Sequence, residues 1–209
     1  MFRQFNRYAI FGAAIAGISL FGACSDSTSQ GHGMLEVQLT DAPFSSDSVS
    51  RVDIFVVRVD AKQASSDSAD VARGATDDSA TVNGWTTIAT PKQKIELLAL
   101  RSGLFTTLGA KSMSPASYQS FRLIIDPSQS SVTLKDGTVL TSTSSPNVTF
   151  PSAARTGIKI NLATPIAVTA NDTTKALVDF DVSQSFVQRG NAIATHGLLF
   201  KPVITMRAK

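Results

Sequence analysis

The feature that most constrains the fold of this chain is an alternation of apolar and polar residues that recurs in short segments. Leu35, Val37 and Leu39 alternate with Glu36 and Gln38, and this two-residue period is typical of a strand that buries one face. Turn-forming residues separate such segments about every ten residues. Beyond the first 24 residues, no stretch of ten or more residues has a convincing helical period. The chain is therefore predicted to be all-β.

The predicted strands are residues 34–39, 52–61, 85–89, 104–108, 118–126, 132–135, 138–141, 158–162, 165–169, 176–182 and 198–206. Asp136-Gly137 is a strong hairpin signal. The change of apolar phase after Val57 predicts a β-bulge or a strand that is apolar on both faces near its middle. Residues 95–100 fit a helical turn or a strand. We expect a single β-sandwich of about nine to eleven strands over residues 34–209, Ig-like or prealbumin-like, with a barrel as the second choice.

Residues 63–83 interrupt this pattern with Ser, Asp, Ala, Gly and Thr and almost no apolar bulk. Because such a segment has little to bury, we expect a long, mobile insertion loop. Asp67, Asp70, Asp77 and Asp78 raise the alternative of a calcium site. Their spacing does not match an EF-hand loop, so a solvated loop is the favoured interpretation.

The N-terminus reads as a cleaved export signal. Arg3 and Arg7 precede a run of thirteen apolar or small residues over 9–21, the order of a secretory signal peptide. As a helix, that run spans about 20 Å, short of the roughly 30 Å hydrocarbon core. A permanent transmembrane helix is therefore the weaker interpretation.

Cys24, the only cysteine, follows Gly22 and Ala23, and this context resembles a bacterial lipobox. The resemblance implies cleavage after residue 23 and acylation of Cys24, with residues 24–33 as a flexible tether. The alternative is ordinary cleavage after Ala23, which leaves a soluble protein. Ser25 follows the cysteine in place of an aspartate, and this favours the outer membrane over the inner one.

Charge and composition limit the classes of partner. The formal charge is +3, and loss of residues 1–23 removes two arginines and no acid, which leaves a mature charge of +1. No run of Lys or Arg exists, so nucleic acid is not expected as a partner. The expected partners are the membrane, through the N-terminal lipid, and an unidentified envelope protein or polysaccharide.

Catalytic and metal-binding signatures are absent from the sequence. It contains no GxSxG, HExxH, GxxxxGK or Ser-x-x-Lys motif. The two histidines are His32, in the tether, and His196, near the last predicted strand. They do not supply the three or four converging ligands of a zinc site. We therefore expect no cofactor and no metal, and a triad of His196 with some Ser and Asp stays a minor alternative.

Three further residues have a structural interpretation, and two of them, Asp41 and Trp85, also have a functional one. Asp41 precedes a proline-containing turn, where its carboxylate can accept backbone N–H groups; the alternative is ligand or calcium binding at the end of the sandwich. The Tyr118 hydroxyl can bond to backbone across a sandwich corner. Trp85 is interpreted as a core or corner aromatic, with a sugar-stacking platform as the alternative.

Arg122, Lys159, Asp179 and Asp181 each interrupt an apolar strand and point away from its buried face. If these strands pair with one another, the four side chains form cross-strand ion pairs on an exposed face. The alternative is a binding surface for an acidic or polar ligand. Together with Asp41, these residues are the candidate polar cluster of the chain.

Seven groups of residues, taken in order, resemble a bacterial and archaeal family known only as domain of unknown function 4382. They are residues 35–43 (LEVQLTDAP), 52–56 (VDIFV), Trp85 with 95–98 (IELL), 118–123 (YQSFRL), 156–159 (TGIK), 179–181 (DFD) and 201–204 (KPVI). The resemblance spans residues 33–206 and implies a secreted or lipid-anchored protein, but no activity.

From these observations we expect a lipid-anchored envelope protein with a non-enzymatic β-sandwich that binds or supports another component. A carbohydrate- or peptide-binding surface module is the alternative, and exposed aromatic residues on one face would favour it. An envelope hydrolase is a less favoured third class. It would need a pocket that brings His196 close to Asp and Ser.

Overall fold

The computed structural model describes residues 31–42, 48–64, 81–82, 84–151 and 157–209. Its strands are β1 (Gly33–Asp41), β2 (Val49–Gln63), β3 (Thr81–Val82), β4 (Trp85–Ala89), β5 (Gln93–Glu96), β6 (Thr106–Met113), β7 (Ala116–Leu134), β8 (Val139–Leu140), β9 (Val148–Thr149), β10 (Ile158–Val168), β11 (Thr173–Phe180), β12 (Phe186–Gln188), β13 (Leu198–Phe200) and β14 (Ile204–Ala208). Three one-turn helices accompany them: η1 (Leu97–Leu100), α2 (Val182–Ser185) and α3 (Ile193–His196). The all-β prediction is confirmed.

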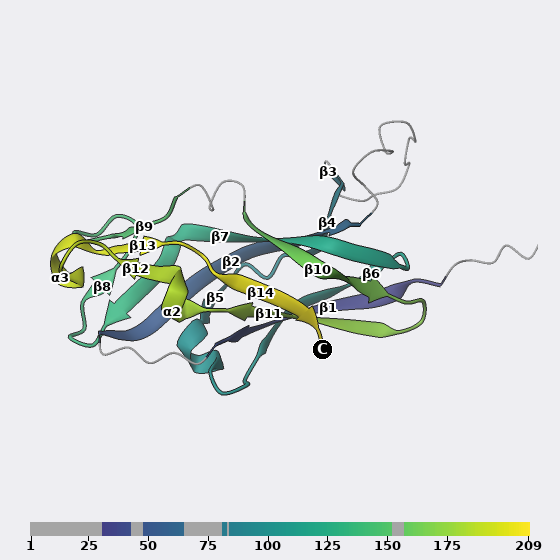
Figure 1. Cartoon of the computed structure of the whole chain (residues 1–209), viewed down its shortest axis with the longest axis horizontal. Coiled ribbons are helices and arrows are strands. Elements are labelled where there is room, and N and C mark those ends of the chain that lie inside the picture. Colours follow the sequence, from purple (N-terminus) through teal and green to yellow (C-terminus); the bar gives the residue numbers. More distant parts are fainter. Residues whose placement is uncertain (1–30, 43–47, 65–80, 83, 152–156) are drawn as a thin grey trace, which may run out of the picture.

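Two large sheets form the body of the molecule. One has four strands in the order β14-β11-β1-β6. The other runs β10-β7-β2-β4-β3, with β5 added to β2 and β8 added to β7. Figure 1 shows β2, β7 and β10 along one side of the molecule and β1, β11 and β14 along the other. A small sheet, β12-β13-β9, lies at one end, near α3.

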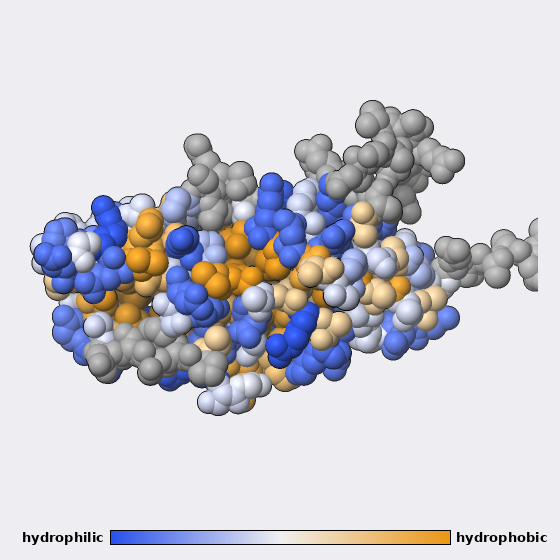
Figure 2. Space-filling model, viewed as in Figure 1, coloured by the Kyte–Doolittle hydropathy of each residue, from blue (hydrophilic) through white to orange (hydrophobic). Residues whose placement is uncertain are grey.

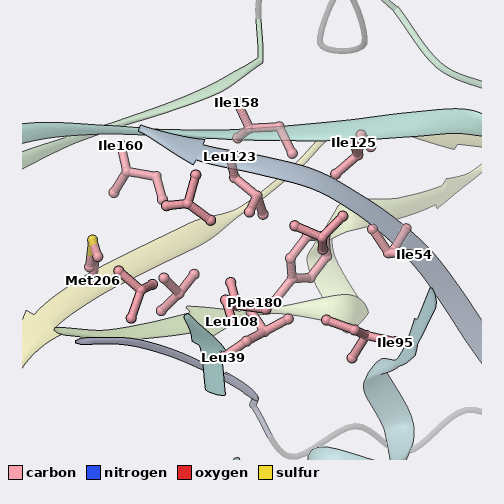
Figure 3. Packing of buried hydrophobic residues seen from close by; sticks show 14 of the residues in the cluster. Leu39, Ile54, Ile95, Leu108, Leu123, Ile125, Ile158, Ile160, Phe180 and Met206 are labelled. Atoms are coloured by element: carbon pink, nitrogen blue, oxygen red, sulfur yellow. The ribbon is translucent and has the colours of Figure 1, made fainter. Parts of the chain in front are cut away.

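The core fills the space between the two large sheets. Figure 3 shows Leu123, Ile158 and Ile160 pointing into this space from the larger sheet, towards Leu39 and Phe180 of the smaller one. Full burial of such a side chain stabilises the fold by about 1.5–3 kcal/mol. Because each strand alternates between its two faces, the residues between these positions lie on the outer faces of the sheets.

The strand pairing explains several sequence signals. The bulge expected after Val57 is confirmed, since the pairing of β2 with β7 shifts register between Val56 and Arg58. The Asp136-Gly137 hairpin joins β7 to β8, and Gly137 has the positive φ of 90° that this turn requires. Residues 95–100 contain both expected structures, because Glu96 ends β5 and Leu97 begins η1.

Other boundaries differ from the expectation. Fourteen strands are described instead of nine to eleven, partly because β3, β8 and β9 are two-residue pairs. The segments 118–126 and 132–135 form one continuous strand, β7. Most of the expected loop over 63–83, with its four aspartates, lies outside the described residues, as do the signal peptide, Cys24 and the start of the tether. Within the described ranges, no helix is long and apolar enough to cross a membrane.

Candidate functional site

A carboxylate that the sequence did not single out is the centre of the first candidate site. Asp60 lies on the outer face of β2 and is only 1% exposed. The Arg122 guanidinium of β7 donates to its Oδ2 from Nη2 at 2.6 Å and from Nε at 3.0 Å. Arg58 Nε lies 2.9 Å from Oδ1, and the Thr87 hydroxyl donates to the same oxygen at 2.9 Å. Both carboxylate oxygens therefore have partners, so this buried charge is paired and hydrogen-bonded.

The sheet register builds this network as a straight row across four strands. Thr87 of β4 pairs with Asp60 of β2, Asp60 pairs with Arg122 of β7, and Arg122 pairs with Lys159 of β10. A second row runs beside it through Trp85, Lys62, Ser120 and Asn161. Residues that face one another in this way share one surface of the sheet.

Two neighbours fix the position of the Arg122 side chain. Its guanidinium lies 4.7 Å from the centre of the Trp85 ring, in a cation–π contact. On its other flank lies Gly157, which has a φ of 75°, and a Cβ built there would come 2.6 Å from Arg122 Cγ. Trp85 is therefore a half-buried aromatic on the outer face, and the interpretation as a core residue is wrong.

The second candidate site lies at the end of the four-stranded sheet. Asp41, the last residue of β1, is 3% exposed, and its Oδ1 accepts the backbone N–H of Val182 at 3.2 Å. Its Oδ2 has no hydrogen-bond partner among the described residues. Burial, aided by the nearby charges of Asp179 and Asp181, raises the pKa of Asp41 from 3.8 to about 7. The expected role of Asp41 as a backbone acceptor is confirmed, although the N–H comes from a distant segment.

Asp179 and Asp181 serve different purposes beside it. Asp179 lines a pocket of about 290 Å³ together with Asp41, Arg207 and Lys209, and its buried Oδ1 also lacks a partner within the described ranges. Asp181 is not a strand residue. It is the N-cap of α2, where its Oδ1 accepts the N–H of Gln184 at 3.1 Å. The hydrogen bond from the Ser183 hydroxyl is the main reason that the pKa of Asp181 is lowered.

The predicted polar cluster is therefore divided between two places, and the expected ion pairs within it are wrong. Arg122 and Lys159 belong to the seven-stranded sheet, whereas Asp179 belongs to β11 of the other sheet. The alternation along each strand placed these opposite charges on outward faces and so suggested that they pair. That alternation does not reveal which strands are neighbours in a sheet. The true partner, Asp60, was visible in the sequence only as a polar residue next to Val59.

The remaining candidates have simple placements. The Tyr118 hydroxyl donates to the Ser114 carbonyl at 3.0 Å, which confirms its expected bond to backbone. His196 ends α3 and is exposed, and its ring lies against Gly190. No described residue forms a hydrogen bond with its imidazole. In the described ranges, no three His, Cys, Asp or Glu side chains gather as a metal site would require.

Comparison with known proteins identifies the family. No curated protein and no solved structure matches the chain. The sequence model of a domain of unknown function, DUF4382, matches residues 32–202, which is most of the chain and nearly all of the β-sandwich. The match contains Asp60, Arg122, Asp41, Asp179 and Asp181, and six of the seven groups of residues that suggested the resemblance in full; it ends within the seventh, 201–204. The chain therefore belongs to the DUF4382 family.

Proposed function

We propose that this protein is a lipid-anchored lipoprotein of the cell envelope whose β-sandwich acts as a binding module and not as an enzyme. The observation that carries the proposal is the sequence Gly22-Ala23-Cys24 at the end of a short apolar run with a basic start. The first strand begins at Gly33. The anchored cysteine and the folded domain are thus separated only by the short polar tether 24–33.

A binding role fits the chemistry of the Asp60 network. Asp60 is held by two guanidinium groups and a hydroxyl, so neither oxygen is free to accept a proton from a substrate. The guanidinium groups keep further N–H groups at the surface, because Arg58 is 40% exposed and Arg122 is 20% exposed. Such an arrangement holds cations in place for recognition and supplies no general base.

The proposed location follows from the anchor. Several acyl chains, at about 0.8 kcal/mol per buried CH₂, hold a protein stably at a membrane. Ser25, immediately after the cysteine, favours the outer membrane. The proposed partners are this membrane, through the lipid, and an envelope polysaccharide or protein on the outer faces of the sandwich.

The test is metabolic labelling of the full chain with a fatty acid in a bacterial host. Wild type is expected to incorporate the label and to partition into detergent, and Cys24→Ser is expected to lose both properties. Ser25→Ala is the matched control, because it changes the neighbouring residue and leaves the acylated sulfur in place. If Cys24→Ser labels as strongly as the control, the lipid-anchor proposal is wrong.

A further inference from the structure

The outer face of the seven-stranded sheet carries a local excess of positive charge. The two adjacent rows contain one carboxylate, Asp60, which shares its row with Arg122 and Lys159. Arg58, which pairs with Ile124 next to this row, also forms an ion pair with Asp60. We call Arg58, Asp60, Arg122 and Lys159 with Trp85 the cationic face. Its net charge is +2 on a mature chain whose total is +1. The charge is therefore concentrated here and is not a general property of the surface.

A comparison along the same sheet shows that this excess is unusual. Towards the other end of β2, Arg51 lies 2.7 Å from Asp53 and 3.0 Å from Glu96. That cation is matched by neighbouring carboxylates, as in an ordinary surface ion pair. By contrast, Lys159 lies directly opposite Arg122, and like charges in facing positions destabilise a sheet. Among the residues that the structure describes, no ion pair accounts for Lys159.

The cations are held in fixed positions before any ligand arrives. Asp60 and Trp85 orient Arg122, and Gly157 provides room for its side-chain stem. Among the described residues, Arg122 donates to Asp60 through Nε and Nη2, and this leaves its Nη1 amino group for a further acceptor. A preorganised guanidinium loses little freedom on binding an oxyanion, and this favours carboxylate or phosphate recognition.

The surroundings indicate which kind of polyanion fits. Ser120 and Asn161 lie in the second row and supply hydroxyl and amide groups, joined by a bond of 2.9 Å from the hydroxyl to the amide oxygen. Among the described residues, the exposed large hydrophobic side chains are Met34, Leu104, Phe105, Val139 and Val187, and none of them lies on β2, β4, β7 or β10. A face whose exposed side chains are polar suits a hydroxylated chain better than a lipid bilayer.

We propose that the cationic face binds an acidic polysaccharide, with its carboxylates on Arg58, Arg122 and Lys159 and a sugar ring near Trp85. The charge of the face is complementary to such a chain, and the rows of cations, hydroxyl and amide groups match its alternation of carboxylates and hydroxyls. Figure 2 shows hydrophobic residues across the middle of the molecule, with hydrophilic residues above and below them. This inference names the ligand of the proposed binding module and rests on that part of the proposed function, but it does not depend on the lipid anchor.

The experiment measures binding of the full chain, in detergent solution, to polygalacturonate and to uncharged dextran. Wild type is expected to bind polygalacturonate, with an affinity that falls as the salt concentration rises, and not to bind dextran. Lys159→Glu is expected to weaken binding at least about tenfold, because it replaces a charged hydrogen-bond donor by a repelling group. Lys159→Gln is expected to give a smaller loss in the same direction.

Lys135→Glu is the matched control, since it makes the same charge change at the exposed Asp136-Gly137 turn, outside the cationic face. It is expected to bind like wild type. Unfolding curves check that all variants keep the fold, as the exposure of Lys159 predicts. Equal losses in Lys159→Glu and Lys135→Glu would overturn the proposal, because net charge alone would then explain binding.

Two other polyanions separate the proposed ligand from its rivals. Mixed micelles containing phosphatidylglycerol present a lipid headgroup, and a short DNA duplex presents a phosphate chain. Tighter binding to either, with the same dependence on Lys159, would overturn the choice of polysaccharide, and so would a failure of wild type to bind polygalacturonate. Failure of the fatty-acid labelling would leave this result unchanged, so the two proposals fail separately.

Discussion

Replacing Asp41 by asparagine tests whether a buried carboxyl at the end of β1 makes stability depend on pH. Burial raises the pKa of Asp41 from 3.8 to about 7 in the folded protein. The unfolded chain ionises this carboxyl near its usual pKa of about 3.9. The stability that comes from keeping it neutral is therefore fully present below pH 4 and is lost as the pH rises towards 7.

The magnitude follows from the difference between these pKa values. One pKa unit corresponds to about 1.4 kcal/mol, so the ionised carboxyl costs the folded state about 4 kcal/mol at pH 8. About 2–3 kcal/mol of that cost appears between pH 5 and pH 8. Asp41→Asn removes the charge but keeps an oxygen that can accept the N–H of Val182. We expect the variant to gain about 2–3 kcal/mol over wild type across this interval.

The assay is urea unfolding of both proteins at pH 5 and pH 8, with Asp136→Asn as the control. The hydrogen bond from the Thr138 N–H lowers the pKa of Asp136, so its stabilisation is present above the usual pKa and is lost only as the pH falls below about 4. Asparagine before Gly137 also suits a hairpin turn. The control should therefore follow wild type between pH 5 and pH 8. If Asp41→Asn also runs parallel to wild type, the reasoning about Asp41 is refuted.

Two further predictions concern the Asp60 network and residues 63–83. Asp60→Ala should lower the free energy of unfolding by about 3–5 kcal/mol, because it leaves two guanidinium groups without their buried partner. Lys159→Ala should change the free energy of unfolding little. Equal losses for the two variants in chemical denaturation would contradict this prediction. Replacing residues 65–80 by a short Gly/Ser turn should change the free energy of unfolding by less than about 1 kcal/mol, because loop closure depends weakly on length. Collapse of that variant in thermal melting would show that the segment is packed or liganded.

The strands could be predicted where local pattern decides them. The alternation of Leu35, Val37 and Leu39 with polar residues places β1, and the residues Asp136-Gly137 place the β7–β8 hairpin. The bulge near Val57 was visible for the same reason, since an extra residue shifts the apolar phase. These features depend only on neighbours in the sequence, and so a single chain reveals them.

Strand neighbours and site partners could not be predicted, because they depend on pairing across long separations. β1 pairs in parallel with β11, which lies more than a hundred residues later, and nothing in the sequence of either strand identifies the other as its partner. Asp60 and Arg122 are 62 residues apart and meet only through the register of β2 with β7. The sequence showed that Asp179 points away from the buried face of its strand, but it did not show to which sheet that strand belongs.

The family segments meet at two places, and the fold explains only one of them. Asp41 bonds to Val182 and the Asp181 N–H to the Val203 carbonyl, which ties the point where the chain leaves the four-stranded sheet to the point where it returns. These contacts therefore have a structural role in holding the fold together. At the other place, Arg122 contacts Trp85 and lies opposite Lys159. The two facing positive charges destabilise the sheet and do not join separate parts of the chain. A cost that the fold does not need is the reason to look for a ligand there.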